Sequence, residues 1–259
     1  MELNLTGKVA VVTGASKGIG LAVTNALAAE GVLVVAGART TTALDGLGDH
    51  VHPVAVDLTS PNGPAQLIEQ AVATFGGLDI LVNNVGGLKP HLGGFVSITD
   101  DDWLRALTIN LLAPVRTTRA AVPHLVRRGS GTIVTISSVN AFLPDPPIID
   151  YSAAKAALTN FSKALSKELG PQGIRVNTIS PGPVSTPLWL GAGGVAETFA
   201  AGSGADPAAV ADGAVAGSAT KRFTTPEEVA DLVLLLASGR AGNITGADYV
   251  IDGGLIQTL

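Results

Sequence analysis

The sequence predicts an α/β fold with a doubly wound parallel sheet flanked by helices, formed by one domain over residues 1–259. Two observations carry this prediction. Short apolar, strand-like runs alternate with helical patterns along the whole chain, and such alternation is typical of a parallel sheet. A length of 259 residues suits one domain with a large buried core, and no linker, repeat or break in composition marks a second domain.

The elements follow in order from the N-terminus. The first strand is expected at 8–13, where an apolar run meets a glycine-rich turn and then a helical pattern that ends at Gly31. Further strand-like runs complete a seven-stranded sheet at 33–37, 52–56, 80–82, 131–137, 175–180 and 249–251. The most irregular stretch, 191–220, is rich in Gly and Ala and poor in charge. We expect it to belong to a mobile lid over the active site at about 187–224.

The glycine turn after the first strand indicates a dinucleotide-binding site. Gly14, Gly18 and Gly20 let the backbone approach a pyrophosphate closely, and the free amides and dipole at the start of the helix favour its charge. The spacing is G-x-x-x-G-x-G, which differs from the commoner G-x-G-x-x-G. Residues 14–18 also fit the G-x-S-x-G elbow of serine hydrolases around Ser16. We disfavour that alternative, because only one strand precedes Ser16 and all four histidines lie in the first half of the chain.

Tyr151 and Lys155 indicate a carbonyl-reducing site. Residues four apart on a helix point the same way, so the Lys155 ammonium can lie near the Tyr151 phenol and favour the phenolate. An unperturbed tyrosine, with a pKa of roughly 10, exchanges protons poorly near neutrality. Ser138 lies thirteen residues upstream of Tyr151 and completes the set.

Over nearly all its length the chain resembles the short-chain dehydrogenase/reductase family, in particular its 3-oxoacyl carrier-protein reductase branch. The motifs that carry the resemblance are, in order, TGASKGIG at 13–20, Asp57 in VDLTS, NNVG at 83–86, Asn110 in LTINLLAP, Ser138 with Tyr151 and Lys155, SPGPVSTP at 180–187 and DYVIDGG at 248–254. One departure is Val85, where most members have alanine. The resemblance implies a single-domain Rossmann fold.

The resemblance also implies catalytic roles. Tyr151 is expected to donate the proton and Ser138 to hold the substrate oxygen. Lys155 is expected to lower the phenol pKa and to bind the nicotinamide ribose. Asn110, in a helix that the family distorts at this position, is expected to hold a water that relays protons to Lys155. Ser137 is the alternative to Ser138, but strand alternation turns it to the opposite face.

Cofactor contacts carry over by position from the same resemblance. Asp57 is expected at the adenine, Asn83 on the adenosine side, Ile19 and Gly20 at the pyrophosphate, and Thr186 at the carboxamide. The full expected set is Gly14, Ser16, Lys17, Gly18, Ile19, Gly20, Arg39, Asp57, Leu58, Asn83, Gly86, Tyr151, Lys155, Pro181, Gly182, Val184 and Thr186.

Charge at the end of the second strand predicts the type of cofactor. NAD enzymes place an acid there for the ribose hydroxyl, whereas this chain has Ala38 followed by Arg39, with Lys17 inside the glycine turn. Two cations and no acid suit a 2′-phosphate, and the planar fork of arginine makes Arg39 the stronger candidate. NADP(H) is therefore favoured over NAD(H).

The substrate-facing loops are largely apolar. Their candidate contacts are Leu88, His91, Val139, Phe142, Leu188 and Trp189. An uncharged, fairly hydrophobic ketone or secondary alcohol fits such walls best. A 3-oxoacyl thioester is the alternative substrate, although Gln172 stands where reductases of acyl carriers often have a basic residue. A cofactor-binding regulator without catalysis is the alternative of another class, and the sequence does not fix the direction of reaction.

Composition narrows the remaining possibilities. With no cysteine and four histidines in no metal-binding spacing, we expect no metal. A net charge of −5 without a basic run argues against nucleic acid. The absence of a signal peptide or a long apolar run predicts a cytoplasmic protein with no membrane partner.

An oligomer is also expected. A mean hydropathy of +0.41 with 14% charged residues is apolar for a lone domain and hints at surface buried between subunits. The resemblance implies a homotetramer, with a homodimer as the alternative. The tail residues Leu255, Ile256 and Leu259 are candidates for the interface or for packing on their own subunit.

Overall fold

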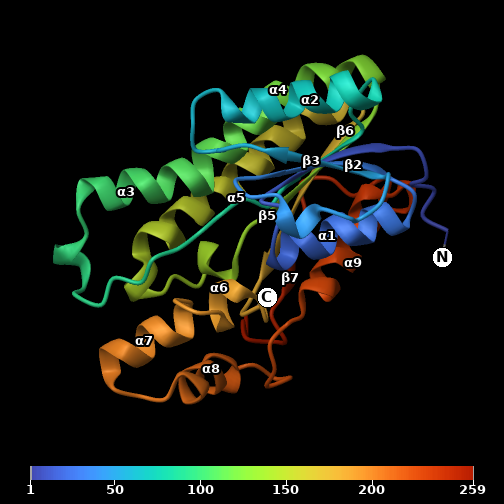
Figure 1. Cartoon of the computed structure of the whole chain (residues 1–259). Coiled ribbons are helices and arrows are strands. Elements are labelled where there is room, and N and C mark those ends of the chain that lie inside the picture. The colour runs from blue at the N-terminus through green and yellow to red at the C-terminus, as the bar shows by residue number, and fades with distance from the viewer. Residues whose placement is uncertain (1, 259) are drawn as a thin grey trace.

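A seven-stranded parallel sheet organises the chain, in the order β3-β2-β1-β4-β5-β6-β7 (Figure 1). The computed structural model describes residues 2–258. The strands are β1 (Val9–Thr13), β2 (Leu33–Ala38), β3 (Val51–Ala55), β4 (Ile80–Asn83), β5 (Gly131–Ile136), β6 (Ile174–Pro181) and β7 (Asp248–Ile251). All seven predicted strands form, with ends that shift by one residue. β6 is the longest because it pairs with β5 along its first part and with β7 up to Pro181.

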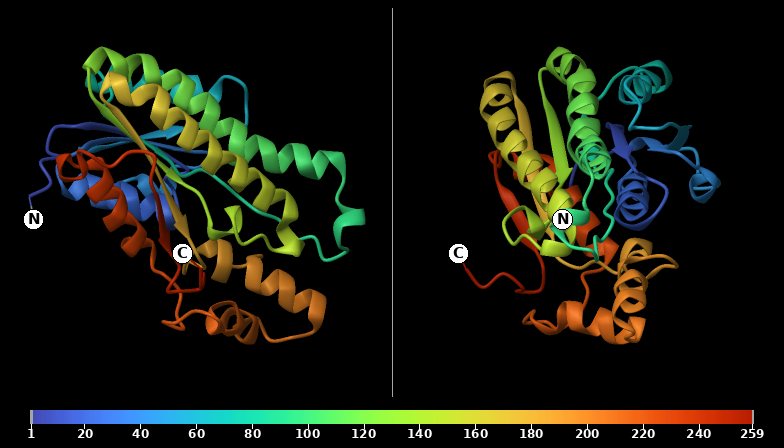
Figure 2. Two further views of the ribbon diagram at one scale, coloured as in Figure 1. Left: turned by 180° about the vertical axis from the view of Figure 1, so that it is seen from behind. Right: turned by 90° about the vertical axis from the view of Figure 1, so that its left-hand side faces the viewer.

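Helices cover both faces of this sheet (Figure 2). On one face, α1 (Gly18–Ala29) and α9 (Pro226–Ala237) pack against each other and against the strands. The other face carries α2 (Gly63–Phe75), α4 (Ala113–Arg128) and α5 (Ile149–Leu169), and α3 (Asp100–Leu107) precedes α4. The predicted doubly wound Rossmann arrangement is confirmed.

The core is divided between the two faces by strand alternation. Val12 and Val34 belong to the buried cluster under α1 and α9, whereas their neighbours Val11 and Val35 belong to the cluster under α2 and α4. Because successive side chains of a strand point to opposite faces, an all-apolar strand is what a sheet covered on both sides requires. The continuous apolar run in 9–12 thus encodes a central strand.

The segment expected to be an irregular lid is mostly helical. It forms α6 (Pro187–Leu190), α7 (Val195–Ser203) and α8 (Pro207–Ala216), which pack on one another beyond the ends of β6 and β7 (Figure 1). The expectation of irregular structure was wrong because alanine, the commonest residue here, is the best helix former, and Asp206 caps α8 by accepting from the Ala208 amide. Its mobility stays a prediction.

Candidate active site

A cavity of about 860 Å³ opens at the carboxyl ends of the strands. Its wall includes Gly14 after β1, Ala38 of β2, Asp57 after β3 and Asn84 after β4. The chain order of the strands reverses between β1 and β4, and ligands of open α/β sheets bind at such a switch point. The carboxyl ends of β5 and β6 complete the wall through Ser138 and Pro181.

The glycine turn forms a close-fitting cradle at one end of the cavity. Gly14 and Gly18 have φ values of +65° and +54°, which residues with a Cβ rarely adopt. A Cβ on Gly18 would lie 3.1 Å from the Thr186 side chain, across the cavity mouth. Gly20 does not line the cavity, contrary to the prediction. A Cβ there would lie 2.2 Å from the Gly14 carbonyl oxygen, so this glycine is needed where α1 packs under the turn.

Positive charge gathers at this end. Lys17 and Arg39 line the cavity, as do Ser16, Ile19 and Leu58. Asp57 also lines it, and its Oδ1 accepts hydrogen bonds from the Thr59 amide (2.9 Å) and the Thr59 hydroxyl (2.7 Å). These bonds hold the pKa of Asp57 below its usual value, and the charge of Arg39 adds to the effect. The Asp57 carboxylate is thus held near Arg39, the cation predicted from the sequence to bind a 2′-phosphate.

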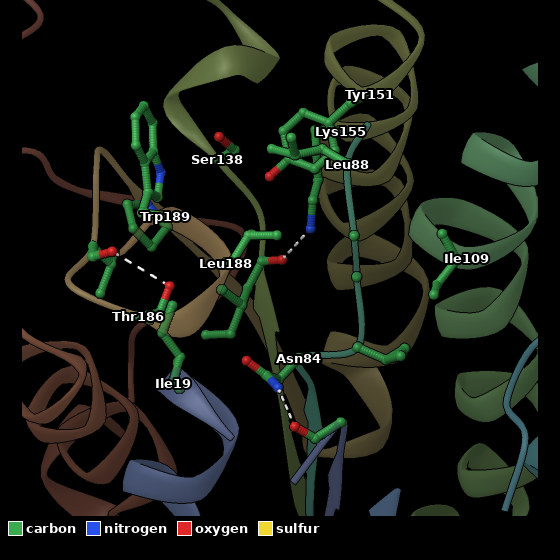
Figure 3. Close-up of a pocket in the computed structure, with 18 of the residues that line it drawn as sticks. Ile19, Asn84, Leu88, Ile109, Ser138, Tyr151, Lys155, Thr186, Leu188 and Trp189 are labelled. Atoms are coloured by element: carbon green, nitrogen blue, oxygen red, sulfur yellow. Dashed lines mark hydrogen bonds between the residues drawn. The ribbon is translucent and has the colours of Figure 1, made fainter. Parts of the chain in front are cut away.

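Asn84, and not the predicted Asn83, faces the cavity. Asn83 is the last residue of β4 and points into the core, where its Nδ2 donates to Thr118 Oγ1 of α4 at 2.9 Å. The next residue leaves the strand on the other side, and Asn84 Nδ2 donates to the Thr13 and Gly14 carbonyls at 2.9 and 3.1 Å (Figure 3). Successive side chains of a strand point to opposite faces, so of two adjacent asparagines only one can face the cavity.

Asn110 lies in a π-helical segment, Thr108–Leu112, between α3 and α4. Its side chain is fully buried and forms two hydrogen bonds to the segment after β4. Nδ2 donates to the Gly87 carbonyl at 2.8 Å, and Oδ1 accepts from the Gly87 amide at 3.1 Å. The helix distortion implied by the family resemblance is present. Gly86 lines the cavity beside it, where a Cβ would lie 2.9 Å from Asn110 Oδ1.

Tyr151 and Lys155 occupy the same side of α5 and face Ser138 across the cavity (Figure 3). Lys155 is 3% exposed, and its Nζ donates to the Ile136 carbonyl at 2.8 Å and lies 5.7 Å from the centre of the Tyr151 ring. The Ser138 hydroxyl donates to Asn140 Oδ1 at 3.1 Å. Ser137 also lines the cavity, but its hydroxyl is paired with Thr159 Oγ1 of α5 at 2.6 Å, so the choice of Ser138 over Ser137 stays a prediction.

Burial governs the protonation of this group. It raises the pKa of the Tyr151 phenol above 10.0, although hydrogen bonding by the Ser138 hydroxyl opposes the rise. Burial also lowers the pKa of Lys155 from 10.5 to about 8. Among the protein's own groups, desolvation of the phenolate is the largest influence on the phenol pKa, and Lys155 does not lower it as predicted. The neutral phenol, which is the form that donates a proton, is favoured.

The opposite wall comes from the segment after β6 and from the lid helices. Pro181, Gly182, Val184 and Thr186 line it, as predicted. Thr186 also lies beside the glycine turn, since a Cβ on Gly18 would come within 3.1 Å of its side chain.

The substrate end is walled largely by apolar side chains. Leu88, Val139, Leu188 and Trp189 line it, as predicted (Figure 3). Two other predicted contacts do not. His91 is buried against Asp150. Phe142 is half exposed and lies outside the cavity lining, whereas its neighbour Leu143, which is equally exposed, belongs to that lining.

Several wall residues were not predicted from the sequence: Ile109 of the π-helical segment, and Val195, Phe199 and Ala214 of the lid helices. Val195 and Phe199 are four residues apart on α7 and so share a face; a predicted helix would have revealed them. The tail residue Leu255 also lines the cavity, so this part of the tail packs on its own chain. Leu259 lies outside the described residues.

No helix among residues 2–258 is long and apolar enough to cross a membrane. Within the same part of the chain, no group of three or more His, Asp or Glu side chains is arranged to hold a metal ion.

Comparison with known proteins agrees with this geometry. A family described as enoyl-(acyl carrier protein) reductase matches residues 14–256. The chain is 33% identical to a 3-oxoacyl-[acyl-carrier-protein] reductase of Thermotoga maritima over 98% of this chain and 100% of that one. It is 34% identical to a 3-alpha-(or 20-beta)-hydroxysteroid dehydrogenase of Mycobacterium bovis over 100% of this chain and 93% of the relative.

A solved structure extends the similarity to three dimensions. L-sorbose reductase of Gluconobacter frateurii, complexed with NADPH and L-sorbose, has a TM-score of 0.92 and 35% identity, and each chain is covered completely. Matches of this extent, together with the Ser138, Tyr151 and Lys155 arrangement, establish that the chain belongs to the short-chain dehydrogenase/reductase family of oxidoreductases.

Proposed function

We propose that the protein is an NADPH-dependent oxidoreductase that interconverts an uncharged, fairly hydrophobic ketone and its secondary alcohol. The observation that best supports this is one cavity with two chemically different ends. One end carries Lys17 and Arg39 beside a glycine turn, and the other brings Ser138, Tyr151 and Lys155 to an apolar chamber.

The first end fits a dinucleotide phosphate. The turn is a cradle that any Cβ at Gly18 would narrow, and α1 begins there without a side-chain cap from Lys17, so its first amides are free for a phosphate. Arg39 and Lys17 would hold the 2′-phosphate, Asp57 the adenine and Thr186 the carboxamide. The cofactor would supply a hydride to the carbonyl carbon.

The protein's own groups handle the proton. Tyr151 in its neutral form donates a proton to the carbonyl oxygen as the alcohol forms. The Ser138 hydroxyl, which now donates to Asn140, turns to donate to the same oxygen. Lys155, with a pKa of about 8, exchanges protons readily near neutrality and can resupply the phenol. We propose that the π-helical segment at Asn110 holds the water that connects Lys155 to solvent.

The substrate chamber favours neutral compounds. Leu188, Trp189 and Phe199 provide apolar walls, and Trp189 is braced edge-on by Phe223, with ring centres 5.7 Å apart. Asp145 also lines the cavity, and burial raises its pKa. Since the Asp145 carboxylate has no ion-pair partner among residues 2–258, a negatively charged substrate would meet uncompensated repulsion.

A 3-oxoacyl thioester is the second candidate substrate, favoured by the similarity to a 3-oxoacyl-[acyl-carrier-protein] reductase. Gln172 and Asp145 weigh against an acidic carrier as the source of that thioester. A regulator that binds the cofactor without catalysis is the candidate of another class, and the intact Asn110, Ser138, Tyr151 and Lys155 set weighs against it.

The first experiment compares binding of NADPH and NADH, and then follows NADPH oxidation with hydrophobic ketones, a 3-oxoacyl thioester and a sugar. Tyr151→Phe should lower turnover by about 10²- to 10⁴-fold and leave NADPH affinity unchanged, because only proton transfer is lost. Tyr249→Phe is the matched control, since the other tyrosine lies in β7 outside the cavity. Full turnover by Tyr151→Phe would contradict the mechanism, and cofactor binding without any turnover would favour the regulator.

A further inference from the structure

A buried histidine and aspartate connect the substrate-facing segment to the helix of Tyr151, and the proposed mechanism uses neither. His91 lies on the segment that leaves β4, three residues after the cavity residue Leu88. Asp150 lies in the first turn of α5, directly before Tyr151. Each side chain is only 5% exposed, although aspartate is mostly exposed in folded proteins and histidine is intermediate in burial.

Hydrogen bonds join these residues in one continuous path. His91 Nε2 lies 3.1 Å from Asp150 Oδ2, and the other carboxylate oxygen, Oδ1, accepts from the Tyr151 amide at 2.8 Å. A second bond runs in parallel, from the His91 amide to the Pro147 carbonyl at 2.7 Å. The path therefore begins on the segment that carries Leu88 and ends on the backbone of the proposed proton donor.

The Asp150 carboxylate has few alternatives to His91. Lys89, the nearest cation along the segment, is engaged with Asp102 at 3.2 Å. Among residues 2–258, His91 is the basic side chain found within 4 Å of the Asp150 carboxylate. A buried carboxylate that loses its partner must be rehydrated or protonated, and rehydration here requires the segment to move away from α5.

We propose that His91 and Asp150 form a positioning pair that fixes the substrate-facing segment 87–94 relative to the Tyr151 hydroxyl. The inference rests on the proposed function. A general acid must be within hydrogen-bond reach of the atom that it protonates, and a displacement of about 1 Å can cost about 100-fold in rate. The pair fixes the position of the wall of the substrate chamber relative to the proton donor. It is expected to contact neither substrate nor cofactor, since neither residue lines the cavity.

The test compares His91→Leu, His91→Gln, Asp150→Asn and the double variant His91→Leu/Asp150→Asn. Each is assayed for the single-turnover rate of NADPH oxidation at saturating ketone, for NADPH affinity and for thermal stability. His91→Leu should lower the rate by about 10- to 100-fold with NADPH affinity unchanged. His91→Gln, whose amide can still donate to the carboxylate, should restore the rate to within about threefold of the original protein.

The double variant separates positioning from structural support. In the double variant, stability should recover, because the Asp150 charge is removed together with His91 and no buried carboxylate remains unpaired. The single-turnover rate should stay low, because segment 87–94 is still not connected to α5. Thr118→Val is the control: it removes the buried hydrogen bond to Asn83, away from the cavity, and should lower stability without lowering the rate.

Two results would overturn the inference: an unchanged rate in His91→Leu, or a rate that recovers with stability in the double variant. Should no ketone be turned over by the original protein, the proposed function fails and hydrogen exchange decides the inference separately. Faster amide exchange in 87–94 and at the start of α5 in His91→Leu, with ordinary exchange in His91→Gln, would support the pair. Equal exchange in both variants would refute it.

Discussion

At the scale of single residues, the site holds a lysine whose burial costs stability. The pKa of Lys155 falls from 10.5 to about 8 on burial, a difference that corresponds to about 3 kcal/mol of unfolding free energy when the lysine is charged. Below about pH 8 the folded protein must keep a buried ammonium. The cost is relieved as the pH rises from about 8 towards 10.5, because the folded-state lysine is then neutral.

Lys155→Met should therefore stabilise the protein while abolishing turnover. Near pH 7 we expect a gain of about 1 to 2 kcal/mol in urea unfolding, since the lost bond to the Ile136 carbonyl offsets part of the relief. The gain should shrink near pH 10. Lys163→Met is the control, because this exposed lysine on the same helix also donates to a carbonyl, that of Gly246. A Lys155→Met variant no more stable than the original protein near pH 7 would contradict the assignment.

Arg39 carries the prediction of cofactor type. Arg39→Leu should weaken NADPH binding by about 10- to 100-fold, the loss expected for a charge-assisted contact, and change NADH binding little. Fluorescence titration of both cofactors at low and high salt measures this. Arg119→Leu, which removes an exposed arginine on α4 outside the cavity, controls for net charge. Equal weakening of both cofactors would rule out recognition of the 2′-phosphate by Arg39.

The sequence was a good guide where covalent spacing fixes geometry. Ser138 is the second residue after β5, and Tyr151 and Lys155 lie one turn apart on α5, so their convergence follows from local structure. The sequence was a poor guide where the path of a loop decides whether a side chain faces the cavity. Phe142 and His91 lie in segments whose path is set by contacts with α5, and Asn83 differs from Asn84 only in which side of a strand it faces.

At the scale of elements, the π-helical segment supports the backbone after β4. Asn110 bonds both polar groups of Gly87, so the segment that carries Leu88 and His91 depends on a side chain from a distorted helix. This contact does not show in composition, and the helices of the lid show only in their alanine content, because Gly and Ala give no apolar periodicity that would mark the face of a helix. The family resemblance predicted the distortion of this helix, whereas the contact between Asn110 and Gly87 became visible only in the structure.

Gly86→Ala tests this support. Its Cβ would lie 2.9 Å from Asn110 Oδ1 and 3.5 Å from Lys155 Nζ, so Asn110 must shift; we expect a loss of about 1 to 3 kcal/mol in stability, typical of overpacking, together with reduced turnover. Gly87→Ala is the matched control, since a Cβ there meets nothing within 4 Å. Thermal unfolding and steady-state assays compare the two, and equal effects of both changes would argue against the Asn110 contact.

At the scale of the whole molecule, the sheet ends at two edge strands, β3 and β7. Among residues 2–258, β7 pairs with β6 alone, and its Val250 side chain is 46% exposed. Natural proteins cover or blunt such edges because unpaired strands invite association. The low proportion of charged residues points the same way, and we propose that further copies of this chain cover this surface in a homotetramer, or in a homodimer.

Sedimentation equilibrium near micromolar concentration should give a mass of about four chains of 25.9 kDa each. Val250→Lys places a charge on the β7 edge and should shift the population to two chains or one, because burying an unpaired ammonium between subunits is unfavourable. Val96→Lys is the control, since this side chain is 97% exposed on a short turn remote in sequence from β7, and it should leave the mass unchanged.

A single-chain mass for the original protein would exclude the assembly, and an unshifted mass in Val250→Lys would place the contact on another face. A dissociated Val250→Lys variant should retain NADPH binding, because the residues proposed to hold the cofactor all lie in the cavity of a single chain. Loss of binding on dissociation would show that the assembly also maintains the site.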